Sequence, residues 1–208
     1  DGPLKRTGRG AAAAARGEVT RSAITRAAAE LIGEEGWGGV TTRAIAARAG
    51  VPHAAVSYHF RGREALLREA AMVTTTEFFA AAIEVLSTAP GGLTDAITAT
   101  LGAYRDLPVV RDRLAVVLEA NRQATRDPWL AERMREILHT YIAGLAMIIE
   151  ADQAAGRLDP GLSAPRLAAV VAGALDGIGL QAAFDPDVDV MALGATLTQL
   201  LDSRSETT

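Results

Sequence analysis

Apolar side chains along this 208-residue chain recur three and four positions apart, which is the spacing of one face of an α-helix. The segment 20–32 shows the pattern clearly, with Ala23, Ala27 and Leu31 on one face. No segment sustains the alternation of apolar and polar residues that marks a half-buried β-strand. The pattern therefore predicts an all-α fold of about nine helices, with a small N-terminal head and a larger C-terminal body.

Glycine, proline and capping residues between the apolar patterns place the expected helix ends. Thr41 or Thr42 is a suitable N-cap, and so is Ser163, which Pro165 follows in the first turn. Residues 1–17 are basic and rich in glycine and alanine, and we expect a flexible arm there. The expected helices cover residues 20–32, 43–49, from 52, 63–86, 93–107, 109–125, 128–155, from 163 to 184, and from after 189 to 201.

The run "TTRAIAARAGVPHAAVSYHF" at 41–60 combines two short helical patterns with a glycine between them. Gly50 stands where a helix-turn-helix needs a residue at positive φ, which glycine adopts without steric cost. Ala46 is small enough to let the two helix axes approach, and Val56 and Phe60 are spaced to point back to the core. These features together predict a helix-turn-helix.

The second short helix has another face that packing does not need. In a helix-turn-helix, the early residues of this helix touch base edges in the major groove, and its end and flanks touch phosphates. Arg61 and Arg63 follow directly and would add cations next to the DNA backbone. The residues on this face are His53, Ala54, Ser57 and Tyr58, with His59 at its end.

Charge is divided unevenly along the chain, whose net charge is −4. Residues 1–63 hold ten Lys and Arg against five Asp and Glu, whereas residues 64–208 hold eleven against twenty. A basic segment joined to an acidic body is typical of a protein whose basic end meets an anionic polymer. Such a division also arises by chance, so charge alone leaves both interpretations open.

The longer run "TTRAIAARAGVPHAAVSYHFRGREALL" closely resembles the DNA-binding motif of the TetR (tetracycline-repressor-like) family of bacterial transcriptional regulators. The preceding "ITRAAAELIGEEGWGGVT" looks like the first helix and glycine turn of that family, so the resemblance covers about residues 18–70. It implies a DNA-binding domain over 18–64 and an effector-binding and dimerisation domain over 65–208. Ser57 departs from the aromatic residue often found at its position, and Arg63 stands where lysine is common.

The resemblance also implies roles for single residues of the head. His53, Ala54 and Ala55 would face the bases of double-stranded DNA. The implied phosphate contacts are Thr42, Arg43, Tyr58, His59 and Arg63.

Two apolar stripes near the C-terminus predict a homodimer. They lie on the last two expected helices, and the resemblance implies that such a pair meets its two-fold mate as a four-helix bundle. The alternative is that both stripes are core within one chain. The predicted interface residues are Leu167, Val170, Gly173, Ala174, Gly177, Ile178, Leu193, Leu197 and Leu200.

The resemblance further implies a small-molecule pocket in the body. Because aromatic residues make up only 4% of the chain and polar groups are few on the body's helix faces, we expect an apolar effector. Taken singly, each candidate is better explained as a core residue than as a ligand contact. The candidates are Phe78, Tyr104, Asn121, Trp129, Met134, Tyr141 and Met147.

Catalytic, metal and cofactor sites have little support in the sequence. The chain has no cysteine, and His53 and His59 are six apart, which fits no usual zinc spacing; His139 reads as an ordinary core or surface residue. "GIGLQA" at 177–182 follows no strand, and "DPDVDV" at 185–190 lacks the glycine of a calcium loop. We expect no metal, no cofactor and no enzyme activity.

No apolar run reaches the roughly 18 residues of a membrane span, and the N-terminus lacks the apolar core of a signal peptide. We therefore expect a cytoplasmic, nucleoid-associated protein. The sequence predicts a ligand-responsive repressor that binds a palindromic operator as a dimer. The alternatives are a helical oligomerisation or binding module without DNA readout, and a regulator that has lost its effector response.

Overall fold

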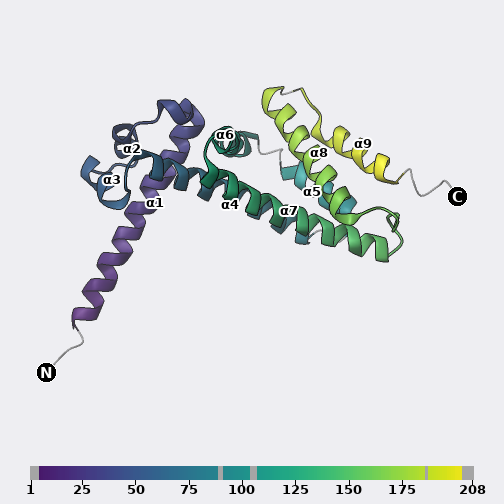
Figure 1. Cartoon of the computed structure of the whole chain (residues 1–208), viewed down its shortest axis with the longest axis horizontal. Helices are drawn as coiled ribbons and strands as arrows, with labels where there is room; N and C mark the ends of the chain where they lie inside the picture. The colour runs from purple at the N-terminus through teal and green to yellow at the C-terminus, as the bar shows by residue number, and fades with distance from the viewer. Residues whose placement is uncertain (1–4, 89–90, 104–106, 186, 203–208) are drawn as a thin grey trace. The chain divides into compact units, whose positions relative to one another are not determined.

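The computed structural model describes residues 5–88, 91–103, 107–185 and 187–202, which contain nine α-helices and no β-strand (Figure 1). The predicted all-α fold is confirmed. In chain order the helices are α1 (Lys5–Gly39), α2 (Thr42–Arg48), α3 (His53–His59), α4 (Arg63–Thr88), α5 (Leu93–Ala103), α6 (Leu107–Ala124), α7 (Pro128–Ala154), α8 (Ala164–Phe184) and α9 (Val190–Asp202).

Helix α1 starts earlier than the sequence predicted. It starts at Lys5, so the expected flexible arm over residues 1–17 is helical from that residue on. The alanine run in "GRGAAAAARG" explains the difference, since alanine is the strongest helix former. One of the glycines predicted to stop this helix does so: Gly36, with φ 70° and ψ 165°, separates the long helix from a short segment that continues to Gly39.

The remaining helix ends lie within a few residues of their predicted positions. Thr41 caps α2 by accepting a hydrogen bond from the Ala44 N–H at 3.1 Å. Ser163 stands at the N-cap of α8 but makes no side-chain cap hydrogen bond. The predicted end of α5 near residue 107 is wrong, because α5 ends at Ala103 and α6 already begins at Leu107. Pro108 therefore falls inside the first turn of α6, where a missing N–H costs nothing.

The chain divides into two compact units, and the first joins segments far apart in sequence. It comprises residues 1–75 and 112–130, so most of α6 packs with the helix-turn-helix. Ile24, Ile45, Leu66 and Leu67 are fully buried in its core. The predicted domain boundary after residue 64 does not coincide with the end of this packing unit.

The second unit comprises residues 76–111 and 131–208, and α5 packs there against α8 and α9. Gly194 lets α9 approach α5 closely, since a Cβ at this position would collide with Leu101. The buried carboxylate of Asp152 on α7 accepts a hydrogen bond from the Leu93 N–H at 2.8 Å and also pairs with Arg157. A side chain of α7 thus satisfies the N-terminus of α5.

Helix α8 alone among the described helices has the length and apolar composition that could cross a membrane. Asp176 interrupts the apolar run within this helix. In the structure Ala168, Val171 and Leu175 on one face of α8 are buried against the rest of the chain. Burial in the second unit accounts for the apolar character of that face.

Candidate nucleic-acid interface

Helices α2 and α3 form the predicted helix-turn-helix. Gly50 adopts φ 66° between them, and the Val51 N–H donates to the Ala46 carbonyl at 3.0 Å to close the turn. Ala46, Val56 and Phe60 are buried as their spacing predicted. The turn and the apolar contacts together fix the second helix against the first.

The opposite face of α3 is open to solvent. His53, Ala54, Ser57 and Tyr58 are all exposed, and Tyr58 keeps 85% of its surface. Its only described ring contact is an edge-on approach to His59, with ring centroids 5.0 Å apart. Ala55 and His59 are half-buried at the edges of this face. An exposed tyrosine on a rigid helix is suited to contact with another molecule.

Two further candidates lie at the N-terminus of α2. The Thr42 hydroxyl lies 3.0 Å from His53 Nε2, so these residues hold the beginnings of α2 and α3 together. Arg43 is exposed, as is Arg61 just after α3. Neither guanidinium has a hydrogen bond or ion pair with another residue that the structure describes, so both cations remain available for phosphates.

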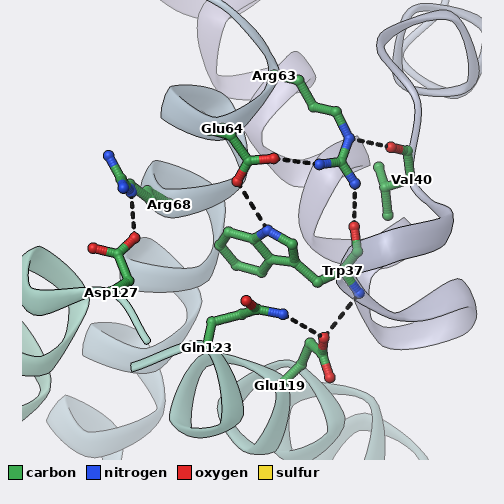
Figure 2. Close-up of polar contacts among 8 residues, drawn as sticks. All are labelled: Trp37, Val40, Arg63, Glu64, Arg68, Glu119, Gln123 and Asp127. Carbon is green, nitrogen blue, oxygen red and sulfur yellow. Dashed lines mark hydrogen bonds and ion pairs between the residues drawn. The ribbon is translucent and has the colours of Figure 1, made fainter. Parts of the chain in front are cut away.

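Arg63 has a different partner from the predicted one. Its Nε donates to the Val40 carbonyl at 2.6 Å, and its Nη atoms donate to the Trp37 carbonyl and pair with Glu64 (Figure 2). The carbonyls at a helix C-terminus carry partial negative charge and lack partners within the helix. Within this chain the guanidinium of Arg63 therefore caps the end of α1.

Arg21 is a residue that the sequence analysis missed. From α1 it donates to the His59 carbonyl at 2.8 Å, pairs with Glu69 and lies 4.4 Å above the centroid of the Phe60 ring. It therefore holds the C-terminal end of α3 against α1 and α4. Its position three residues before the buried Ile24 marked it as lying near the core, but nothing in the sequence indicated a carbonyl partner.

Another arginine of the head, Arg48, is also engaged within the chain. It binds the carboxylate of Glu34 with both Nη atoms, at 2.9 and 2.7 Å, and so links α2 to α1. This hydrogen-bonded arginine lowers the pKa of Glu34. Both groups are exposed to solvent, so the pair adds little to stability. Arg43 and Arg61 are exposed too, but unlike Arg48 they have no partner among the residues that the structure describes.

Figure 2 shows polar contacts of Trp37 that join α1, α4 and α6. The Trp37 backbone N–H donates to Glu119 Oε1 at 3.0 Å, and its indole N–H donates to Glu64 Oε2 at 3.1 Å. The Trp37 carbonyl accepts from Arg63. All three polar groups of a tryptophan that is only 6% exposed are therefore satisfied by charged side chains.

Glu119 is held in place by its neighbours on α6. Arg122 Nε donates to its Oε2 at 2.9 Å, and Gln123 Nε2 lies 3.3 Å from its Oε1. The Arg122 hydrogen bond, assisted by the Trp37 N–H, lowers the pKa of Glu119 to about 2, although partial burial opposes the shift. A carboxyl group with a lowered folded-state pKa stabilises the fold above its unfolded pKa, and that contribution is lost as the pH falls toward about 2.

A second polar contact joins α4 to the start of α7. Arg68 Nε lies 2.5 Å from Asp127 Oδ2, and Asp127 Oδ1 accepts from the Trp129 N–H at 3.1 Å. Asp127 thus caps α7 and pairs with α4 at once. Trp129 itself is exposed.

The structure separates the seven effector candidates. Tyr104 lies outside the described residues, and Asn121, Trp129 and Met147 are exposed, which excludes them from an enclosed cavity within one chain. Phe78, Met134 and Tyr141 are half-buried or buried in the second unit. Phe79, which the sequence analysis did not name, links two of them, with ring centroids 5.5 Å from Phe78 and 5.4 Å from Tyr141.

The interface candidates are also divided. Val170, Gly173, Leu193 and Leu200 are exposed, and Val170 keeps 66% of its surface. Ile178 is buried within its own chain, so its predicted interface role is withdrawn. Ile178 lies on the buried side of α8, and helical spacing alone does not say which side of a helix is buried. The remaining candidates, Leu167, Ala174, Gly177 and Leu197, are half-buried.

Comparison with known families agrees with this geometry. Residues 24–70 match the family model described as bacterial regulatory proteins of the tetR family. Residues 93–205 match the C-terminal domain of BetI-type transcriptional repressors. Together with the helix-turn-helix, these matches define a DNA-binding transcriptional regulator. The chain belongs to the TetR family, as the sequence predicted.

Solved structures share the fold over most of the chain, whereas no curated protein sequence matches. SCO7518 from Streptomyces coelicolor A3(2), a candidate transcriptional regulator, is 30% identical, with 88% of this chain and 98% of that chain covered and a TM-score of 0.62. A candidate regulator from Saccharomonospora viridis in complex with choline is 22% identical (88% and 95% covered, TM-score 0.75). FadR from Bacillus subtilis in complex with stearoyl-CoA is 23% identical (88% and 97% covered, TM-score 0.69).

Substitution of Arg21 tests the anchoring of α3. We expect Arg21→Ala to lower the free energy of unfolding by about 1–2 kcal/mol, because it removes a charge-assisted hydrogen bond and a cation–π contact. Arg26→Ala is the matched control, since Arg26 is an exposed residue of the same helix. Urea denaturation followed by circular dichroism measures both. Equal stabilities of the two variants would show that Arg21 does not anchor α3.

Proposed function

We propose that this protein is a ligand-responsive repressor that binds a palindromic operator as a homodimer. The observation that carries the proposal is the exposed face of α3, where Tyr58 projects into solvent from a helix fixed by the Gly50 turn. Arg43, which no described residue pairs, lies on the adjoining helix. This combination of rigid helix, exposed aromatic and available cation suits a major groove flanked by phosphates.

The residues of the head divide into two roles. His53, Ala54 and Ala55, on the first turn of α3, face the bases, and His53 is the polar side chain among them. Its Nε2 is held by Thr42, which leaves Nδ1 for a base edge. The remaining exposed or half-buried candidates of α2 and α3 hold phosphates. They are Thr42, Arg43, Ser57, Tyr58 and His59.

A homodimer follows from the operator's symmetry and from the outer faces of α8 and α9. Two recognition helices must lie about one DNA turn apart, roughly 34–36 Å, which needs two heads on one particle. Val170 and Leu200 keep 66% and 63% of their surfaces and lie on the two helices with predicted apolar stripes. Gly173 and Gly177, four apart on α8, permit close approach of a partner helix.

An apolar small molecule bound in the second unit is the proposed signal. Phe78, Met134 and Tyr141 are the retained candidates to line its site. The choline and stearoyl-CoA complexes of two proteins with this fold support an effector role for the body. The ligand must prefer the conformation that does not bind DNA, by about 1–3 kcal/mol for ordinary coupling.

The protein acts by binding and not by catalysis in this proposal, and it acts in the cytoplasm at the nucleoid. A helical oligomerisation module without DNA readout is the alternative function. It accounts for the apolar stripes of α8 and α9 but gives no reason for an open α3 face beside an available arginine.

The division of roles in the head predicts different effects for two substitutions. Operators are first selected from random duplexes with the wild-type protein. Arg43→Ala should weaken binding to all duplexes and reduce the slope of log K against log salt by about one, because one phosphate contact is lost. His53→Ala should change the selected sequence more than the affinity for random DNA. Duplex binding and salt dependence that survive both Arg43→Ala and Arg61→Ala would refute the DNA interface.

The proposed interface predicts that charge on the outer faces of α8 and α9 separates the dimer. We expect Val170→Asp with Leu193→Asp to sediment as a monomer, since two carboxylates would be buried without partners. Met147→Asp is the control, because Met147 lies on α7 and its side chain is 67% exposed, as much as that of Val170. A double variant that stays dimeric in sedimentation velocity would place the interface elsewhere.

Effector release is tested through the genes beside the selected operators. The substrates of the enzymes that these genes encode are screened for compounds that dissociate the protein from its operator. The active compound should bind more weakly to the Tyr141→Ala variant than to the wild type. Asn121→Ala, at an exposed position of the first unit, should leave release unchanged. Failure of every compound would remove the effector role and leave the DNA-binding role standing.

A further inference from the structure

The break in α1 at Gly36 places an unusual demand on the residue that follows it. Gly36 departs from helical φ and ψ, and the N–H of Trp37 donates to the carboxylate of Glu119 on α6. The two residues are 82 positions apart in sequence. A side chain of α6 therefore completes the backbone hydrogen bonding at the corner between α1 and α2.

This corner leads directly to the DNA-facing residues. Arg63 holds the carbonyls of Trp37 and Val40, and Val40 immediately precedes Thr41, the N-cap of α2. The first residue of α2, Thr42, binds His53 at the start of α3. A continuous series of hydrogen bonds and short backbone segments thus runs from Glu119 to the recognition helix.

We propose that Glu119 is a positioning residue for DNA binding: α6 holds the α1–α2 corner in its DNA-binding geometry through the contact between this carboxylate and the Trp37 N–H. The inference rests on the proposed function. Glu119 lies behind the helix-turn-helix, so it acts through Trp37 and does not touch DNA.

The chemistry of the contact explains why a carboxylate is suited to this position. One oxygen of Glu119 accepts from Trp37 and Gln123, and Arg122 binds both oxygens at 2.5 and 2.9 Å. Arg122 and Gln123 thereby fix the rotamer of Glu119 on α6. A glutamine can still accept from the Trp37 N–H, but its amide group would face the guanidinium of Arg122.

The test combines a spectroscopic readout of the Trp37 contact with duplex binding by the full-length chain. In protein labelled with ¹⁵N-tryptophan, the backbone N–H signal of Trp37 is identified by its loss in Trp37→Phe, which separates it from that of Trp129. Glu119→Ala should shift this signal and weaken binding to the selected operator about tenfold, within the usual range of coupling between sites. Glu119→Gln keeps one acceptor oxygen, so its Trp37 signal and its operator affinity should both lie between those of Glu119→Ala and the wild type.

Electrostatics gives this experiment a matched control. Removing a negative charge by itself favours DNA binding, so weaker binding by Glu119→Ala must come from altered geometry. Glu132→Ala removes the same charge from a carboxylate that also pairs with an arginine three residues along, on α7. We expect Glu132→Ala to bind the operator as tightly as the wild type and to leave the Trp37 signal in place.

Each outcome distinguishes the positioning role from the proposed function. A Trp37 signal that does not move in folded Glu119→Ala refutes the contact, and unchanged operator affinity despite a moved signal refutes the positioning role. If Glu119→Ala does not fold by circular dichroism, the same two criteria apply to Glu119→Gln. A wild-type protein that selects no duplex refutes the proposed function, and the positioning role falls with it.

Discussion

The backbone groups at the end of α1 lack partners within the helix, and the helix-turn-helix depends on how other side chains satisfy them. Gly36 interrupts the helix, and the carbonyls of Trp37 and Val40 need donors from elsewhere in the fold. Arg63 supplies them from the first turn of α4, and Glu119 accepts the N–H of Trp37. Because unsatisfied buried polar groups cost on the order of 1–3 kcal/mol each, these contacts fix where α2 begins.

The same principle determines how the head uses its positive charge. Arg21 and Arg63 both donate to backbone carbonyls near helix ends, and Arg48 pairs with Glu34. The basic character of residues 1–63 is therefore partly structural, whereas Arg43 and Arg61 are exposed and have no partner among the described residues. A count of charges overstates the electrostatic attraction of this surface for DNA.

The two compact units of this TetR-family chain contain different elements. The first contains the helix-turn-helix together with most of α6, and the second contains α5, α8 and α9 with the aromatic cluster of Phe78, Phe79 and Tyr141. Packing of α6 with the head means that a helix distant in sequence belongs to the DNA-binding part.

The sequence by itself determined the helices, the turn and the family. These depend on local rules, since apolar spacing and Gly50 act over a few residues and motif residues such as Tyr58 and His59 stand next to one another. Only the tertiary structure decided the partners of long charged side chains: 23 residues separate Arg63 from Val40, 38 separate Arg21 from His59, and 82 separate Glu119 from Trp37. It also decided which side of α8 is buried, turning Ile178 inward and Val170 outward. Helical periodicity gives the faces of a helix but not which neighbour covers each face, because that depends on packing between distant segments.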